Sequence, residues 1–69
     1  MNYKILNSGI SVNADAYYLL LEWKDKNMQE FIAYCDENNL PRSINAMNIV
    51  QYNKVVYKAL STDKPILNS

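Results

Sequence analysis

Few residues in this chain are of the types that carry out chemistry, and their arrangement does not favour catalysis. The 69 residues include no histidine and a single cysteine, Cys35. A thiol needs a nearby base to become a strong nucleophile, and no histidine is available for that role. The acids Asp36 and Glu37 are adjacent, so on a helix they point in different directions and do not share a metal ion or a proton. We interpret Cys35 as a small core residue, because it lies on the apolar side of a helical pattern.

The sequence therefore predicts no catalytic residue, no cofactor and no metal site. Its only glycine cannot form a glycine-rich phosphate loop, and its only cysteine excludes an internal disulfide and a cysteine-rich zinc site. So short a chain also has little volume for an active-site cleft beside its core. We expect a protein that is not an enzyme and has no small-molecule substrate.

Binding is the remaining class of function, and the aromatic residues are the first candidates for it. Tyrosine and tryptophan are enriched among the residues that contribute most to protein interfaces. The candidate partner-binding residues are Tyr17, Tyr18, Trp23, Tyr52 and Tyr57. In a small domain the same side chains are also the largest pieces available for the core. Both interpretations stay open at the level of the sequence.

A second hypothesis is DNA binding, because two helical patterns separated by residues 38–42 resemble helix-turn-helix proteins in layout, without a specific motif. In this alternative the following helix reads DNA with side chains that contact bases or phosphates. Those residues are Arg42, Ser43, Asn45, Asn48, Gln51 and Lys54. However, seven Lys and Arg balance seven Asp and Glu, whereas binding to phosphates favours a basic excess. The neutral net charge disfavours this hypothesis.

The candidates must be positioned by a mainly α-helical fold, since the chain is rich in apolar residues and poor in glycine and proline. We predict a single small domain with helices over 14–24, 27–38 and 43–60. Asn13 precedes the first helix as its N-cap, and Asn27 and Glu30 have the spacing of a capping box before the second. Residues 17–23 are also compatible with a buried strand, because so short an apolar run has no decisive periodicity.

The second and third helices carry the clearest patterns. The second should end at Asn38 and Asn39, which favour a left-handed cap, before Pro41 prevents continuation. The third has an apolar arc much broader than the ~100° that one core contact requires. We predict that Ser43 is the N-cap of this helix. Met47 is expected to lie on its narrow polar strip. The width of the arc predicts contacts on two sides. Either the rest of the domain covers the whole arc, or part of the arc contacts a second copy or a partner.

The two ends of the chain have weaker patterns. Over residues 1–12, apolar positions alternate on both sides of a turn at Gly9, which predicts a β-hairpin or a single strand with an ordered arm. We expect Tyr3, Ile5, Ile10 and Val12 to pack on the helices, because an isolated hairpin is only marginally stable. Residues 61–69 are predicted to form a tail that is disordered or, through its aliphatic pair at 66–67, folded onto the core or a partner.

The first residues are too few and too polar for a signal peptide, and no apolar run approaches the ~20 residues of a membrane span. We therefore expect a cytoplasmic protein. The leading hypothesis is a small interaction protein, a regulator or inhibitor of a larger protein, that binds another protein or a second copy of itself. Ten asparagines with abundant Ile, Lys and Tyr are typical of AT-rich bacterial or phage genes. A structural subunit of a larger assembly is a further alternative.

Overall fold

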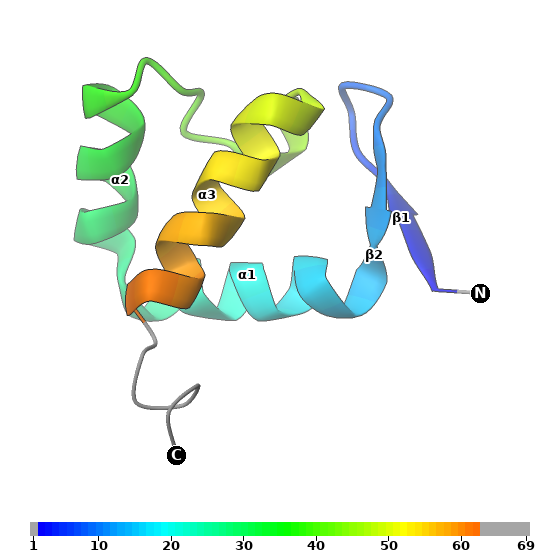
Figure 1. Ribbon diagram of the computed structural model, residues 1–69, viewed down its shortest axis with the longest axis horizontal. Coiled ribbons are helices and arrows are strands. Elements are labelled where there is room, and N and C mark those ends of the chain that lie inside the picture. Colours follow the sequence, from blue (N-terminus) through cyan, green and yellow to red (C-terminus); the bar gives the residue numbers. More distant parts are fainter. Residues whose placement is uncertain (1, 63–69) are drawn as a thin grey trace.

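A computed structural model describes residues 2–62, and it confirms a mainly α fold that begins with a β-hairpin (Figure 1). The elements in order are β1 (Tyr3–Ile5), β2 (Ser11–Asn13), α1 (Ala14–Lys26), α2 (Met28–Glu37), the 3-10 turn η1 (Ile44–Ala46) and α3 (Ile49–Thr62). The hairpin stands at one end of α1 and α2 stands at the other. Helix α3 runs diagonally between them, so that α1 is the element against which the others are placed.

The hairpin is a two-stranded antiparallel sheet in which Lys4 pairs with Val12. Its turn contains Gly9, as predicted, and the φ of Gly9 is +95°, a conformation that glycine adopts without steric cost. The prediction that Tyr3 and Ile5 pack on the helices is wrong, because both side chains are more than half exposed. Successive strand residues point to opposite faces, and the residues that point toward the helices are Lys4 and Val12.

The inner face of the hairpin is completed by Leu6 and by a contact between Lys4 and α1. Leu6, which directly follows β1, is buried and supplies the apolar contact that the exposed strand residues do not make. The ammonium group of Lys4 lies 5.5 Å from the centre of the Tyr17 ring on α1, a cation–π distance. The hairpin is thus held to α1 by one face only.

Helix α1 confirms the helical interpretation of residues 17–23 and continues to Lys26, two residues beyond the predicted end. The Asn13 side chain accepts a hydrogen bond of 2.9 Å from the Ala16 N–H, which confirms the predicted N-cap. The buried residues Tyr17, Leu20 and Trp23 recur every three residues and form the side of the helix that faces the core.

Helix α2 begins at Met28, but the capping box predicted for Asn27 is wrong. The Asn27 side chain makes no bond to the α2 N-terminus and donates to the Trp23 carbonyl at 3.0 Å instead, which closes the end of α1. The predicted left-handed cap is confirmed at Asn39, with φ 56°. There the Leu40 N–H donates to the Cys35 carbonyl at 2.8 Å, the pattern of a Schellman motif.

The largest correction concerns the third helix, which does not run over 43–60. The segment forms η1, a short extended stretch and then α3, and the helix begins at Ile49. Its true N-cap is Asn48, whose side-chain oxygen accepts from the Gln51 N–H at 2.9 Å, while the Gln51 side chain accepts from the Asn48 N–H at 3.0 Å. This reciprocal capping box stabilises a helix start at Asn48, whereas Ser43 makes no side-chain cap.

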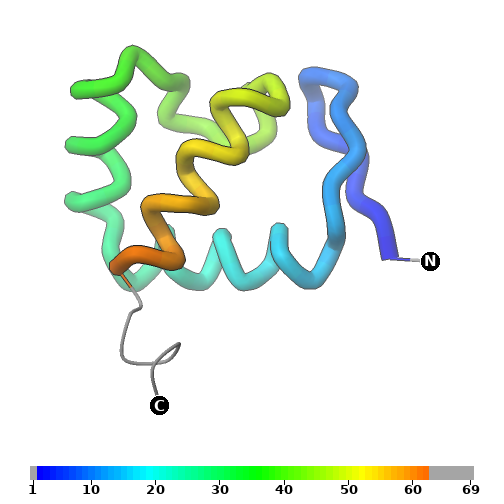
Figure 2. The backbone as a smooth tube through the Cα atoms, in the orientation of Figure 1, coloured from blue at the N-terminus to red at the C-terminus, as the bar shows by residue number. Residues whose placement is uncertain are grey.

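The link between α2 and α3 is held in place by the hairpin turn (Figure 2). The Ser8 N–H donates to the Asn45 carbonyl at 3.1 Å, and the Ser8 hydroxyl donates to the Met47 carbonyl. The Met47 side chain is 0% exposed, so its predicted place on a polar strip is wrong. An extended backbone at Met47 turns this side chain into the core instead of continuing the helical rotation.

Helix α3 ends at Thr62, so Ser61 and Thr62 belong to the helix and not to the predicted tail. Thr62 Oγ1 lies 3.0 Å from a carboxylate oxygen of Glu30 on α2, and Lys58 Nζ lies 3.2 Å from the same oxygen. These contacts join the last turn of α3 to α2. The predictions for the tail from residue 63 onward, including the aliphatic pair at 66–67, lie outside the described residues.

The core gathers side chains from β2, α1, α2, η1 and α3 and from the segments that connect the elements. Its buried members are Leu6, Val12, Tyr17, Leu20, Trp23, Phe31, Cys35, Leu40, Ile44, Met47, Tyr52, Val55 and Ala59. Cys35 is among them, which confirms its interpretation as a core residue. Within residues 2–62, no helix has the length and apolar character needed to cross a membrane.

Replacing Asn48 by alanine should lower the free energy of unfolding by about 1 kcal/mol, because the first turn of α3 loses its side-chain acceptor. Denaturant unfolding monitored by circular dichroism measures this change. The matched control is Asn53→Ala, studied like Asn48→Ala in dilute solution, where no association contributes to stability. It is the same substitution at an exposed position within α3, removes no cap and should not destabilise the helix. Equal stabilities of the two variants would contradict the assignment of the cap.

Candidate functional site

The structure separates the five aromatic candidates into two groups. Tyr17, Trp23 and Tyr52 are buried, so for these three the core interpretation holds. Tyr18 and Tyr57 are exposed, on α1 and α3 respectively. The five rings therefore form no common surface, and only the last two are available to a partner without rearrangement of the core.

The six candidates for DNA contacts are also divided, because four of them already bind protein groups. The Arg42 guanidinium forms two hydrogen bonds with the Asp36 carboxylate, at 3.0 and 2.6 Å. Asn45 donates to the Tyr17 hydroxyl at 3.0 Å, and Asn48 and Gln51 cap each other. Ser43 and Lys54 have exposed side chains. The link before α3 spans residues 38–48, longer than the three or four residues of a helix-turn-helix turn.

Helix α3 has two apolar sides, and residues 2–62 cover only one of them. Tyr52, Val55 and Ala59 face the core. The residues on the other side of α3 are exposed or partly exposed, and Leu19 of α1 is exposed beside them. We call this surface the α1–α3 face. The α1–α3 face consists of Leu19, Ile49, Val50, Val56, Tyr57 and Leu60. The broad apolar arc predicted for the third helix thus corresponds to one buried and one solvent-facing side.

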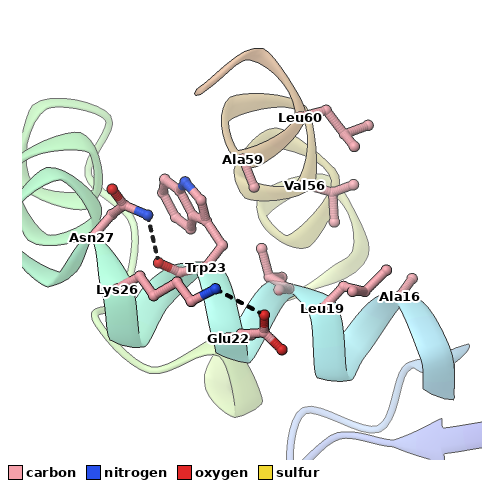
Figure 3. A pocket seen from close by; sticks show the side chains of 10 residues that line it. Ala16, Leu19, Glu22, Trp23, Lys26, Asn27, Val56, Ala59 and Leu60 are labelled. Atoms are coloured by element: carbon pink, nitrogen blue, oxygen red, sulfur yellow. Dashed lines mark hydrogen bonds and ion pairs between the residues drawn. The ribbon is translucent and has the colours of Figure 1, made fainter. Parts of the chain in front are cut away.

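A groove of about 370 Å³ lies where α1 and α3 meet at this face (Figure 3). Val56 and Leu60 point from α3 toward the same side, above Leu19 and Ala16 of α1. The full lining is Ala16, Leu19, Leu20, Glu22, Trp23, Lys26, Asn27, Val56, Ala59 and Leu60. Most of these residues are apolar, so the groove offers its occupant burial of apolar surface more than hydrogen bonds.

Charged residues lie at the border of the α1–α3 face and not within it. Glu22 and Lys26 on α1 form an ion pair of 3.1 Å along one edge of the groove. On the opposite flank of α3, Lys58 pairs with Glu30, and the hydrogen bonds from Lys58 and Thr62 lower the pKa of the Glu30 carboxyl. The apolar centre and charged border follow the usual arrangement of protein interfaces.

The remaining ionisable and polar groups do not favour reaction chemistry. Burial raises the pKa of the Cys35 thiol, with a smaller contribution from the charge of Asp36, so the reactive thiolate is disfavoured. Burial also raises the pKa of Tyr52. Among residues 2–62, no group of three or more potential metal ligands is present. The Cys35 thiol, the one cysteine of the chain, is thus not activated as a nucleophile by its surroundings.

The aliphatic members of the α1–α3 face were not among the residues predicted from sequence to bind a partner. Ile49, Val50, Val56 and Leu60 carry no chemistry of their own and resemble core residues in any sequence pattern. The usable signal was the width of the apolar arc on α3, which exceeds one contact face. Leu19 had no such signal, because its pattern on α1 is apolar nearly all round.

Comparisons with known proteins find no matching family model and no similar chain among the curated proteins or the solved structures.

Proposed function

We propose that this protein is a non-enzymatic interaction module that binds another protein or a second copy of itself through the α1–α3 face. The observation that carries the proposal is the second apolar side of α3, which stays exposed beside Leu19 of α1. Tyr57 is 76% exposed and Leu19 is 68% exposed, on elements whose other side is packed in the core. A contiguous apolar surface with a charged border is the kind of patch that marks an interaction site on a small soluble domain.

The rigidity of the surroundings supports the same proposal. Helix α3 is fixed at its start by the Asn48 cap and at its end by contacts with Glu30 on α2. Side chains on a helix held at both ends lose little backbone freedom on binding, which lowers the entropic cost of association. A role as a regulator or inhibitor of a larger protein fits a module of this size, and that role is part of the proposal.

The experiment is an affinity pull-down of the tagged protein from lysate of its own source, with and without nuclease. Three baits are compared, namely the parent, Leu60→Lys on the α1–α3 face and Ile5→Lys on the exposed side of the hairpin. Each variant replaces an exposed aliphatic residue by lysine, so the charge change is matched. Circular dichroism of both variants first verifies that the helices are retained.

The proposal expects a protein that the parent and Ile5→Lys recover in both samples and that Leu60→Lys loses. A protein recovered equally by all three baits would place the contact elsewhere and contradict the role of the α1–α3 face. Recovery that disappears on nuclease treatment would favour the DNA-binding alternative, in which the exposed Lys54 contacts phosphate.

A further inference from the structure

We propose that the α1–α3 face binds a second copy of this chain, so that two α3 helices pack against each other with Asn53 nearest the twofold axis. This inference rests on the proposed function, because it names the partner of the same face. Three observations support it, namely the placement of Asn53, the charge on the face and the area available.

Asn53 is an exposed polar residue surrounded by the apolar residues of α3. Relative to Asn53, these residues lie at positions −4, −3, +3, +4 and +7, which are the positions that share its side of a helix. They are Ile49, Val50, Val56, Tyr57 and Leu60. Such a pattern has the 3–4 spacing of a helix–helix seam with one central asparagine.

The central position of Asn53 favours a copy of the same helix over an unrelated apolar partner. A wholly apolar partner would leave the Asn53 amide without a hydrogen-bond partner, which is costly in a buried contact. In a twofold dimer the amide group meets the same group of the other copy, and each amide has both a donor and an acceptor to offer. A single asparagine in a helix seam is a known device for fixing register and the number of strands.

The charge distribution permits two copies to approach. No residue of the α1–α3 face is charged, and the formal net charge of the whole chain is zero. Two lysines of α3 lie outside the seam, because they are at +1 and +5 from Asn53: Lys54 is exposed, and Lys58 is paired with Glu30 at 3.2 Å. Identical faces that carry a charge would repel each other, whereas these do not.

The exposed area is sufficient for a small interface. The exposed surface of this face is equivalent to about three fully exposed side chains, summed over Leu19, Ile49, Val50, Tyr57 and Leu60. At roughly 100 Å² of apolar area per side chain this gives about 300 Å² per copy. With a usual polar share, the dimer buries about 1,000 Å² in total, the lower end of specific interfaces. We expect a dissociation constant of about 1–100 µM.

The first test is sedimentation equilibrium of the parent and matched variants over a range of concentrations. Tyr57→Lys should weaken the dimer by at least about 100-fold, because each dimer contains the substitution twice in a central position. Tyr3→Lys is the control, with the same change at a tyrosine that is 61% exposed on the hairpin. It should leave the dissociation constant unchanged.

Asn53 provides a second test with opposite outcomes. Asn53→Lys should abolish association by placing two like charges across the axis, while Asn53→Leu should tighten the dimer by replacing the polar pair with apolar contact.

Under mild oxidation, Asn53→Cys should form a disulfide-linked dimer, because only residues near the axis bring their Cα atoms within about 7 Å. Tyr18→Cys, exposed on another side of α1, should not, and the native Cys35 is buried.

The outcomes separate this inference from the proposed function. A parent chain that stays monomeric at about 1 mM would overturn the second copy as partner, while a protein captured through Leu60 would still support the proposed function. A dimer that is insensitive to Tyr57→Lys and shows no cross-link at position 53 would overturn the placement on α3. A dimer that behaves as described supports the inference even when the pull-down recovers no other protein.

Discussion

Replacing Phe31 by alanine is expected to lower the melting temperature of the protein by roughly 12 °C or more. Phe31 is 1% exposed and packs edge to face on Trp23, with ring centres 6.3 Å apart. Removal of a buried phenylalanine ring costs about 3–5 kcal/mol, since the surrounding side chains do not fill the cavity completely. A chain of this length has only about 3–10 kcal/mol of total stability. The loss therefore amounts to a large part of the whole.

Thermal and denaturant unfolding followed by circular dichroism measure this loss. Tyr57→Ala, studied in dilute solution, is the control, because it also removes a ring but from a side chain that faces solvent. Its stability should stay within about 0.5 kcal/mol of the parent. A similarly small loss for Phe31→Ala would mean that the ring is not part of a tightly packed core.

Met47→Lys is expected to destabilise the protein by several kcal/mol, enough to prevent folding at neutral pH. The Met47 side chain is fully buried, and a lysine there would have to bury its ammonium group or displace the link that holds it. Circular dichroism and urea unfolding at pH 7 would show loss of helical signal or a sharp fall in the unfolding midpoint. A buried unpaired charge is one of the few causes of very large losses of stability from a single substitution.

The control for this substitution is Met28→Lys, since Met28 is 39% exposed in the first turn of α2. It should cost no more than about 1 kcal/mol, the range of surface changes near a helix end. Equal tolerance of both substitutions would place Met47 on a polar helix surface, as a continuous helix over 43–60 requires. The pair thus tests the main correction to the fold.

The parts of the fold that could be predicted are those specified by neighbouring residues. Asn13 before α1, Gly9 in the hairpin turn and Asn39 after α2 each have a local conformational reason, and each was predicted from sequence. The helical pattern on whose apolar side Cys35 lies likewise identified the buried side of α2. These features depend on contacts within about one helical turn, which the sequence displays directly.

The start of α3 was predicted wrongly because its cause is partly distant in the sequence. The Asn48 and Gln51 capping box is visible in the sequence, but Ser43 offered a competing cap. What decides between them includes the Ser8 contacts, which hold residues 45–47 outside a regular α-helix. Nothing near Ser43 encodes a bond to a turn at the other end of the chain.

The candidate site was only partly predictable, for a similar reason. The arc on α3 indicated two contact sides, yet which apolar residues are buried depends on where α1 lies against α3. Trp23 and Tyr57 are both aromatic residues on apolar sides of helices, and only the tertiary arrangement makes one core and the other surface. Residue type alone does not separate the two.

The bonds from Ser8 to the link before α3 also bear on how the protein opens. They close a loop between residues 39 positions apart, and the link that they hold leads directly into the cap of α3. An opening that releases the hairpin therefore also releases the first turn of α3 and exposes the Met47 side chain to water. Hairpin and helix then exchange their amide hydrogens as a single foldon, although one stands at the beginning of the chain and the other near its end.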